Sequence, residues 1–207
     1  GLGDVYKRQN ASSSVVNMLY NTQLMRLAGA DGVAAYGAVM YVNFIFVATF
    51  LGYAIGCAPV ISYHYGAGNH AELKNLYKKS MSIILVWGVI LFGAAQLLAP
   101  VLSKIFVGYN TGLYAMTLHG FRVYAIAFLI IGINIFGSSF FTALNNGLIS
   151  AVISFLRTLM FQVIMVLTLP LWFGINGIWS AISVAEALTL IMTTTFFVRQ
   201  KDKYHYL

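Results

Sequence analysis

The amino-acid sequence predicts an all-α fold, a polytopic membrane bundle of about six helices that each cross a lipid bilayer. Hydrophobic residues make up 60% of the 207-residue chain and charged residues only 8%, and the mean hydropathy is +0.82. A soluble domain needs about a quarter of its residues charged to cover its surface. Most of the outer surface of this protein must therefore face lipid.

Six apolar stretches have the length of a membrane-spanning helix. In chain order they are residues 11–27, 33–62, 76–98, 118–144, 149–169 and 175–198. A span needs about 20 mostly apolar residues, and the second and fourth stretches are long enough to tilt or to extend past the bilayer.

The connections between these stretches are short and rich in glycine and asparagine, which favour turns. They comprise residues 28–32, 66–69, 145–147 and 173–177. Asn69, with Glu72 three residues later, has the pattern of a capping box and predicts a helix start there.

Lysine and arginine residues predict the orientation, because they are enriched in cytoplasmic loops. One side of the membrane receives the groups that follow the second and sixth spans: Lys74, Lys78, Lys79, Arg199, Lys201 and Lys203. The other side has only Arg26, Lys104 and Arg122 near its helix ends. We therefore expect a multi-pass protein whose C-terminus lies in the cytoplasm.

The first nine residues, GLGDVYKRQ, do not match the rest of the chain. They contain three charged residues and no apolar run, so they are not a secretory signal. The string resembles translated adaptor sequence. We treat residues 1–9 as a non-native segment in front of a transmembrane unit, residues 10–207, and expect the native protein to be longer at its N-terminus.

Several functional classes find little support. The net charge of +7 comes from scattered residues, which disfavours a nucleic-acid partner. The single cysteine, Cys57, cannot form a disulfide within the chain or build a thiolate metal site. His64 and His70 have no carboxylate nearby, so we expect no metal site, and no pattern indicates an enzyme or a bound cofactor.

Two ionisable residues lie within predicted spans. Glu186 is near the middle of the sixth span, and Arg157 lies about two turns into the fifth. A charge at membrane depth costs on the order of 2.5–3.5 kcal/mol, so such groups usually face the bundle interior and have a partner. We hypothesise an intramembrane Arg157–Glu186 pair, whose role is either to lock two helices together or to bind a proton or substrate.

Uncharged polar residues form stripes at helical spacing on three other spans. They are Ser14, Asn17 and Asn21 in the first span, Tyr36 and Asn43 in the second, and Asn134 and Ser138 in the fourth. Such residues either join helices through hydrogen bonds or line a wet cavity. With Glu186 they are the candidate residues of a substrate or ion pathway.

Several segments resemble, in the right order, the C-terminal half of the multidrug and toxic compound extrusion (MATE) family. The matching segments are GCAPVISYHYGAGN (56–69), FFTALNNG (140–147), SFLR (154–157), LP (169–170), FGINGIW (173–179) and AEALT (185–189). The resemblance covers nearly all of residues 10–198.

That family has two six-helix lobes around a central cavity, and the resemblance implies that this chain is the C-terminal lobe, helices seven to twelve. It implies secondary antiport in a bacterial inner membrane, in which a cationic, amphipathic drug or toxic compound leaves while H⁺ or Na⁺ enters. The implied partners are the lipid bilayer, the small-molecule substrate and the missing N-terminal lobe of the same protein.

The sequence departs from one version of the family pattern. Members that bind the coupling cation in this lobe carry carboxylates on helices seven and ten, where this chain has Ser14 and Asn134. We therefore expect coupling to belong mainly to the missing N-terminal lobe, with Glu186 as the remaining acidic candidate.

Three other functions remain open. A lipid-linked oligosaccharide flippase of the same superfamily needs a strongly cationic cavity, for which only Arg157 and Arg122 qualify here. A non-transporting membrane scaffold would have well-packed polar stripes and no wet cavity. An intramembrane enzyme lacks a nucleophile–base pair.

Overall fold

The computed structural model describes the backbone of residues 2–207 and the side chains of residues 14–207. The elements are α1 (Leu2–Gly66), α2 (His70–Val107), α3 (Thr111–Tyr124), η1 (Ala125–Ala127), α4 (Phe128–Ala143), α5 (Gly147–Phe155), η2 (Leu156–Met160), α6 (Phe161–Phe173) and α7 (Ile175–Tyr204). These described residues contain no strand, so the predicted all-α fold is confirmed. The predicted non-native segment, residues 1–9, lies outside the described side chains, and its boundary stays a prediction.

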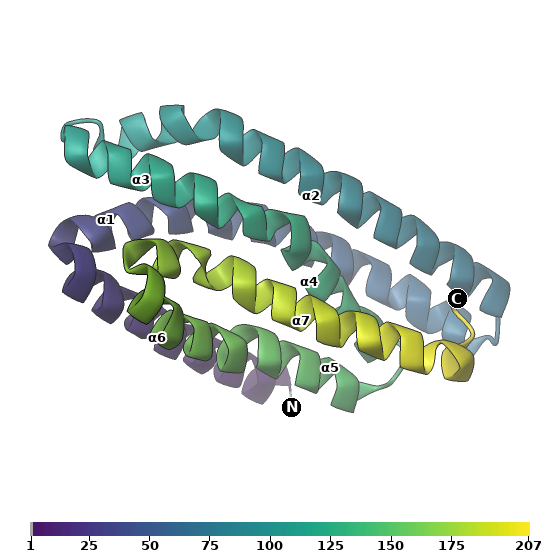
Figure 1. Cartoon of the computed structure of the whole chain (residues 1–207). Coiled ribbons are helices and arrows are strands. Elements are labelled where there is room, and N and C mark those ends of the chain that lie inside the picture. Colours follow the sequence, from purple (N-terminus) through teal and green to yellow (C-terminus); the bar gives the residue numbers. More distant parts are fainter. Residues whose placement is uncertain (1) are drawn as a thin grey trace.

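The first two predicted spans form one continuous element, α1, that reverses direction at Gly29. This residue has φ 64° and ψ −154°, a conformation that only glycine adopts without strain. The predicted break at residues 28–32 is therefore confirmed. Figure 1 shows the purple start of the chain turning back at one end of the bundle. With α1 counted as two, the described residues form six rods: two from α1, then α2, α3–η1–α4, α5–η2–α6 and α7.

The other predicted turns also lie where the sequence places them. Gly68, Asn145 and Gly174 have positive φ values of 68°, 59° and 55°. At the start of α2 the Oδ1 atom of Asn69 accepts a hydrogen bond of 3.1 Å from the Glu72 N–H. The Glu72 carboxylate instead accepts from Asn75, so the described contacts form one half of the predicted capping box.

The predicted third span, residues 76–98, lies within a longer helix. The helix α2 runs from His70 to Val107 and contains Pro100. It ends before Asn110, whose side chain caps α3 by accepting from the N–H groups of Gly112 and Leu113. Charged residues such as Lys104 interrupt the apolar run but not the helix, because a lysine in the last turn can extend toward the aqueous interface.

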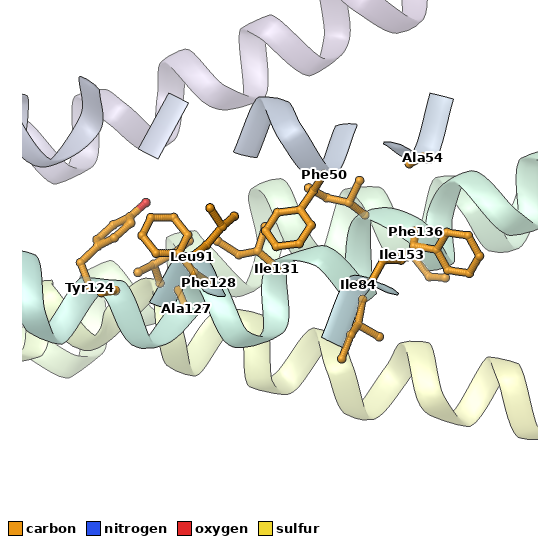
Figure 2. Packing of buried hydrophobic residues seen from close by; sticks show 14 of the residues in the cluster. Phe50, Ala54, Ile84, Leu91, Tyr124, Ala127, Phe128, Ile131, Phe136 and Ile153 are labelled. Atoms are coloured by element: carbon orange, nitrogen blue, oxygen red, sulfur yellow. The ribbon is translucent and has the colours of Figure 1, made fainter. Parts of the chain in front are cut away.

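The helix α4 lies at the centre of the bundle and contacts α1, α2, α5 and α7. Figure 2 shows Phe128, Ile131 and Phe136 buried along it, with Phe50 of α1 nearby. Gly132 and Gly137 allow this close approach, since a Cβ atom at either position would clash with Phe50 or Thr193. Small residues let membrane helices pack closely.

The predicted cytoplasmic residues gather at one end of the bundle, which we call the basic end. There the α1–α2 turn, the α4–α5 turn and the C-terminus meet (Figure 1). Asn146 donates a 2.9 Å hydrogen bond to the Tyr204 hydroxyl, and the rings of His70 and His205 are 4.8 Å apart. The two groups of lysine and arginine residues on α2 and α7 therefore share one end of the molecule.

Candidate functional site

The most deeply buried charged group among the described residues is the carboxylate of Glu186 on α7, which is 0% exposed. Its Oε1 atom lies 2.9 Å from the Nε atom of Arg157, whose side chain is 16% exposed. The structure thus brings the two ionisable residues of the spans together as an ion pair. Each charge reduces the cost of burying the other, which is large in a hydrocarbon environment.

Asn134 of α4 binds the second oxygen of this carboxylate by a hydrogen bond. Its Nδ2 group donates to Glu186 Oε2 at 2.7 Å and to the Glu186 backbone carbonyl at 2.9 Å. Asn134 is itself 0% exposed and lies behind Glu186. Its Oδ1 atom is buried and has no hydrogen-bond partner among the described residues.

The backbone that carries Arg157 is irregular at this depth. Residues Leu156–Met160 form a π-helical turn, and Ala125–Ala127 form a 3₁₀ turn directly after Tyr124 in the facing span. A π turn is wider than an α turn and occurs frequently at functional sites. The two irregular turns lie on spans that border the same cavity.

That cavity has a volume of about 190 Å³. It lies between both segments of α1, Tyr124 of α3, the η2–α6 region, Ile131 of α4 and α7. Its aromatic and polar lining residues are Tyr20, Tyr36, Phe44, Tyr124, Asn17, Asn43, Thr158, Gln162, Arg157 and Glu186. The lining therefore combines aromatic faces, amides and one ion pair.

The tyrosines and amides of the cavity hold one another in place. The rings of Tyr20 and Tyr36 stack with centroids 4.9 Å apart, and the Tyr36 hydroxyl donates to Asn17 Oδ1 at 3.3 Å. The Tyr20 hydroxyl and Asn43 Oδ1 are buried without a partner in the part of the chain whose side chains are described. Buried polar atoms normally have a partner, so these two atoms leave hydrogen-bonding capacity for water or another polar group in the cavity.

The remaining candidate residues fall into two other places. Ser14 and Asn21 line an open groove on the outer face of the first segment of α1, and Asn17 borders both this groove and the cavity. Ser138 lies away from the cavity, where its hydroxyl contacts Ser150 and Ser154 of α5.

Sequence reasoning missed four lining residues that carry a polar group, namely Tyr20, Tyr124, Thr158 and Gln162. Tyr20 is three residues from Asn17 and belongs to the same helical face, so the stripe could have included it. Gln162 is a polar residue within the fifth span. Tyr124 gave no such signal, because aromatic residues are common throughout these spans.

The sequence matches a known protein family and a characterised relative. A family model described as MatE matches residues 9–168. Over 98 residues the chain is 30% identical to the protein named "Lipid II flippase MurJ" of Bacillus subtilis (strain 168), a match that covers 46% of this chain and 18% of that protein.

Solved transporter structures share the fold. One titled as an inward-facing multidrug resistance MATE family transporter of the MOP superfamily matches with a TM-score of 0.88 and 18% identity over 95% of this chain and 46% of that one. Its outward-facing counterpart gives 0.87 and 18% over 96% and 45%. A MOP superfamily transporter from Pyrococcus furiosus, whose title reports reversed polarity of the binding pocket, gives 0.83 and 18% over 93% and 43%. The chain spans less than half the length of each of these proteins.

Proposed function

Since the chain belongs to the MatE family, we propose that it forms the C-terminal half of a secondary active antiporter. This transporter exports cationic or amphipathic compounds across a bacterial inner membrane in exchange for H⁺ or Na⁺. The match of nearly the whole chain to under half of each solved transporter supports the view that another six-helix lobe completes the pathway. The open groove along Ser14 and Asn21 is a surface on which that lobe would pack.

The observation that carries the proposal is a fully buried carboxylate beside an aromatic cavity. Intramembrane ionisable residues are rare and usually mark ion or substrate pathways. Tyrosine faces attract organic cations through the negative charge of their π systems. The cavity therefore suits a cationic, amphipathic guest, and Glu186 supplies a group that can bind the coupling ion.

The ion pair gives a physical reason for exchange. With Glu186 ionised, the charges of Arg157 and Glu186 cancel at the cavity wall. A proton or sodium ion on Glu186 leaves Arg157 uncompensated, and this positive charge repels a cationic guest. At a separation of about 8 Å and an effective dielectric constant of about 20, the repulsion is about 2 kcal/mol. That energy corresponds to about a 30-fold loss of affinity.

Alternating access then requires the two lobes to rock around this site. The similar TM-scores to an inward-facing and an outward-facing transporter support a half that moves as one body. The cluster of lysine and arginine residues supports a basic end, and hence a C-terminus, on the cytoplasmic side.

The experiment measures binding of a fluorescent organic cation to the complete transporter in proteoliposomes as a function of pH. In Glu186→Gln the side chain is permanently neutral, so we expect about 30-fold weaker binding at neutral pH and a shallower pH dependence. Glu72→Gln, at an exposed position near the start of α2, is the matched control and should behave as wild type. Unchanged binding and unchanged proton-driven efflux in Glu186→Gln would leave only a structural role for the pair.

A lipid-linked oligosaccharide flippase is the second candidate, which the similarity to a protein named as a lipid II flippase favours. Its substrate would present phosphate groups to Arg157. The two candidates predict opposite changes in substrate affinity for Glu186→Gln. A neutral residue 186 would strengthen binding of an anionic phosphate and weaken binding of a cation. A scaffold predicts no pH-dependent binding of either probe.

A further inference from the structure

A continuous row of hydroxyl groups lies between α4 and α5. Thr142 Oγ1 is 2.7 Å from Ser150 Oγ, which is 3.0 Å from Ser138 Oγ, which in turn is 2.7 Å from Ser154 Oγ. We call these four residues the hydroxyl seam. Each hydroxyl can both donate and accept. In the structure, Thr142 Oγ1 also donates to the Ser138 carbonyl at 3.0 Å and Ser138 Oγ to the Ser150 carbonyl at 3.2 Å, so these hydroxyls must rotate before hydrogen bonds run along the whole seam.

The inner end of the seam lies about one helical turn from the residues that contact Glu186, on both helices. On one side Thr158, one turn beyond Ser154, lines the cavity together with Arg157 and Glu186 and donates to the Ser154 carbonyl at 2.7 Å. On the other side Asn134, one turn before Ser138, binds the Glu186 carboxylate at 2.7 Å. Among the described residues no hydrogen bond joins a seam hydroxyl to Thr158 Oγ1, Asn134 or Glu186, so about one helical turn separates the seam from the ion pair on each helix.

The outer end of the seam opens at the basic end of the bundle. Thr142 is exposed and directly precedes the α4–α5 turn at residues 144–146. Ser150, by contrast, is buried, and Ser138 and Ser154 are half-buried. The seam therefore leads from the surface at the basic end into the interior, to within about one helical turn of the ion pair.

We propose that the hydroxyl seam carries protons between the basic end and Glu186, so that the coupling ion of this half is H⁺. This inference rests on the proposed antiport. In each transfer a hydroxyl accepts a proton from one neighbour and passes its own proton to the next, so no oxygen gains or loses a proton overall. Thr158 and a water molecule in the cavity complete the path to the Glu186 carboxylate. The hydroxyls then rotate before the next proton passes.

Asn134 is suited to a carboxyl group that changes its protonation state. Its Nδ2 group donates to the ionised carboxylate at 2.7 Å. Its Oδ1 atom is buried and has no partner among the described side chains. If the side-chain amide flips by about 180°, this oxygen can accept a hydrogen bond from a protonated Glu186. One residue can therefore satisfy both forms of the carboxyl group.

Near neutral pH, four other ionisable side chains of the described residues face Glu186 or its cavity. Arg157 faces it from η2, and the phenols of Tyr20, Tyr36 and Tyr124 face the same cavity from α1 and α3. Arginine stays charged and ordinary phenols stay neutral in this range. The alternative role for the seam is interhelical adhesion, in which hydroxyls join α4 to α5 and move no proton.

Ser154→Ala tests the path because it removes the oxygen between Ser138 and the cavity. The complete transporter is reconstituted in vesicles with a trapped pH dye, and proton movement is followed after a rapid jump in external pH in the presence of a fluorescent organic cation. We expect proton movement to slow by about tenfold while equilibrium binding of the organic cation is unchanged. Ser138→Ala, on the facing helix, should give the same result independently.

Two further variants act as controls. Ser139→Ala removes a neighbouring hydroxyl that bonds the Ala54 carbonyl at 3.1 Å, outside the seam, and should leave the proton rate within about twofold of wild type. Ser154→Thr keeps a hydroxyl and should restore the rate. Proton rates in Ser154→Ala and Ser138→Ala equal to those in Ser139→Ala would overturn the path. A wild-type transporter that exchanges its substrate without moving protons would overturn H⁺ antiport itself, and the path with it.

Discussion

The helices α4 and α7 meet in two regions of opposite character. Near the middle of the bundle they meet through Asn134 and Glu186, next to a cavity and an irregular turn. At the basic end they meet through Phe140 and Phe197, whose rings are 5.9 Å apart. The first contact is polar and borders open space, whereas the second is aromatic and closed.

The aromatic contact includes the end of the chain. After α7, His205 adopts a left-handed conformation with φ 56° and turns Tyr206 back into the bundle. The Tyr206 ring is 0% exposed and lies 5.0 Å from Phe140 and 5.1 Å from Tyr77, and its hydroxyl donates to the Phe197 carbonyl at 2.8 Å. The same two helices are thus joined by closely packed rings at the basic end and by a buried amide and carboxylate beside a cavity near their middle.

The largest effect should come from removing Arg157. In Arg157→Ala the buried Glu186 carboxylate loses its cationic partner, which we expect to lower the free energy of unfolding by about 4 kcal/mol. Thermal unfolding of the detergent-solubilised protein measures the change. The double variant Arg157→Ala/Glu186→Gln should recover most of the loss, because no uncompensated charge remains. Equal losses in the single and double variants would contradict a charge-based explanation.

A somewhat smaller loss should follow from Tyr206→Ala at the aromatic contact. Removing a fully buried aromatic ring leaves a cavity, and we expect a destabilisation of about 3 kcal/mol. The adjacent Leu207 is 45% exposed, so Leu207→Ala provides the matched control. Substrate binding in the central cavity should be unchanged in Tyr206→Ala, and a large change there would show that the two regions are not independent.

The smallest effect should come from Tyr206→Phe, which keeps the ring and removes one hydrogen bond. We expect a loss of about 1 kcal/mol at neutral pH. Burial, with smaller contributions from Tyr77 and Tyr204, raises the pKa of Tyr206 above its ordinary value of 10.0. A raised pKa favours the neutral phenol in the folded state, so this stabilisation is complete below about pH 10 and declines as the pH rises further toward the folded-state pKa. Alkaline unfolding curves should therefore be shallower in Tyr206→Phe, and identical curves would contradict the assignment.

The membrane spans could be predicted from the sequence because the bilayer fixes their length and composition. The turns at Gly29, Gly68 and Gly174 were also visible, since each position requires a backbone conformation that glycine favours. The return of Tyr206 into the bundle was not. It depends on a ring-sized space among Tyr77, Phe140 and Phe197, which exists only once distant helices have packed.

The candidate site was predictable only in part. Arg157 and Glu186 could be paired because charges within spans have few other partners. The positions of Asn134 behind Glu186 and of Ser138 against α5 could not be derived, because helical spacing defines a face but not the helix that the face meets. The π turn also shifts the phase of the fifth span, which a constant period of 3.6 residues does not anticipate.

That π turn has a consequence for how the protein can vary. It accommodates one residue more than a regular helical turn would hold, so deletion of a single residue within Leu156–Met160 would yield an unbroken α-helix. The side chains on either side would keep their faces, whereas a deletion elsewhere in the span would rotate one side by about 100° relative to the other. The fifth span can therefore lose one residue at this place without turning its other side chains to new faces, and what it loses is the wide turn that carries Arg157.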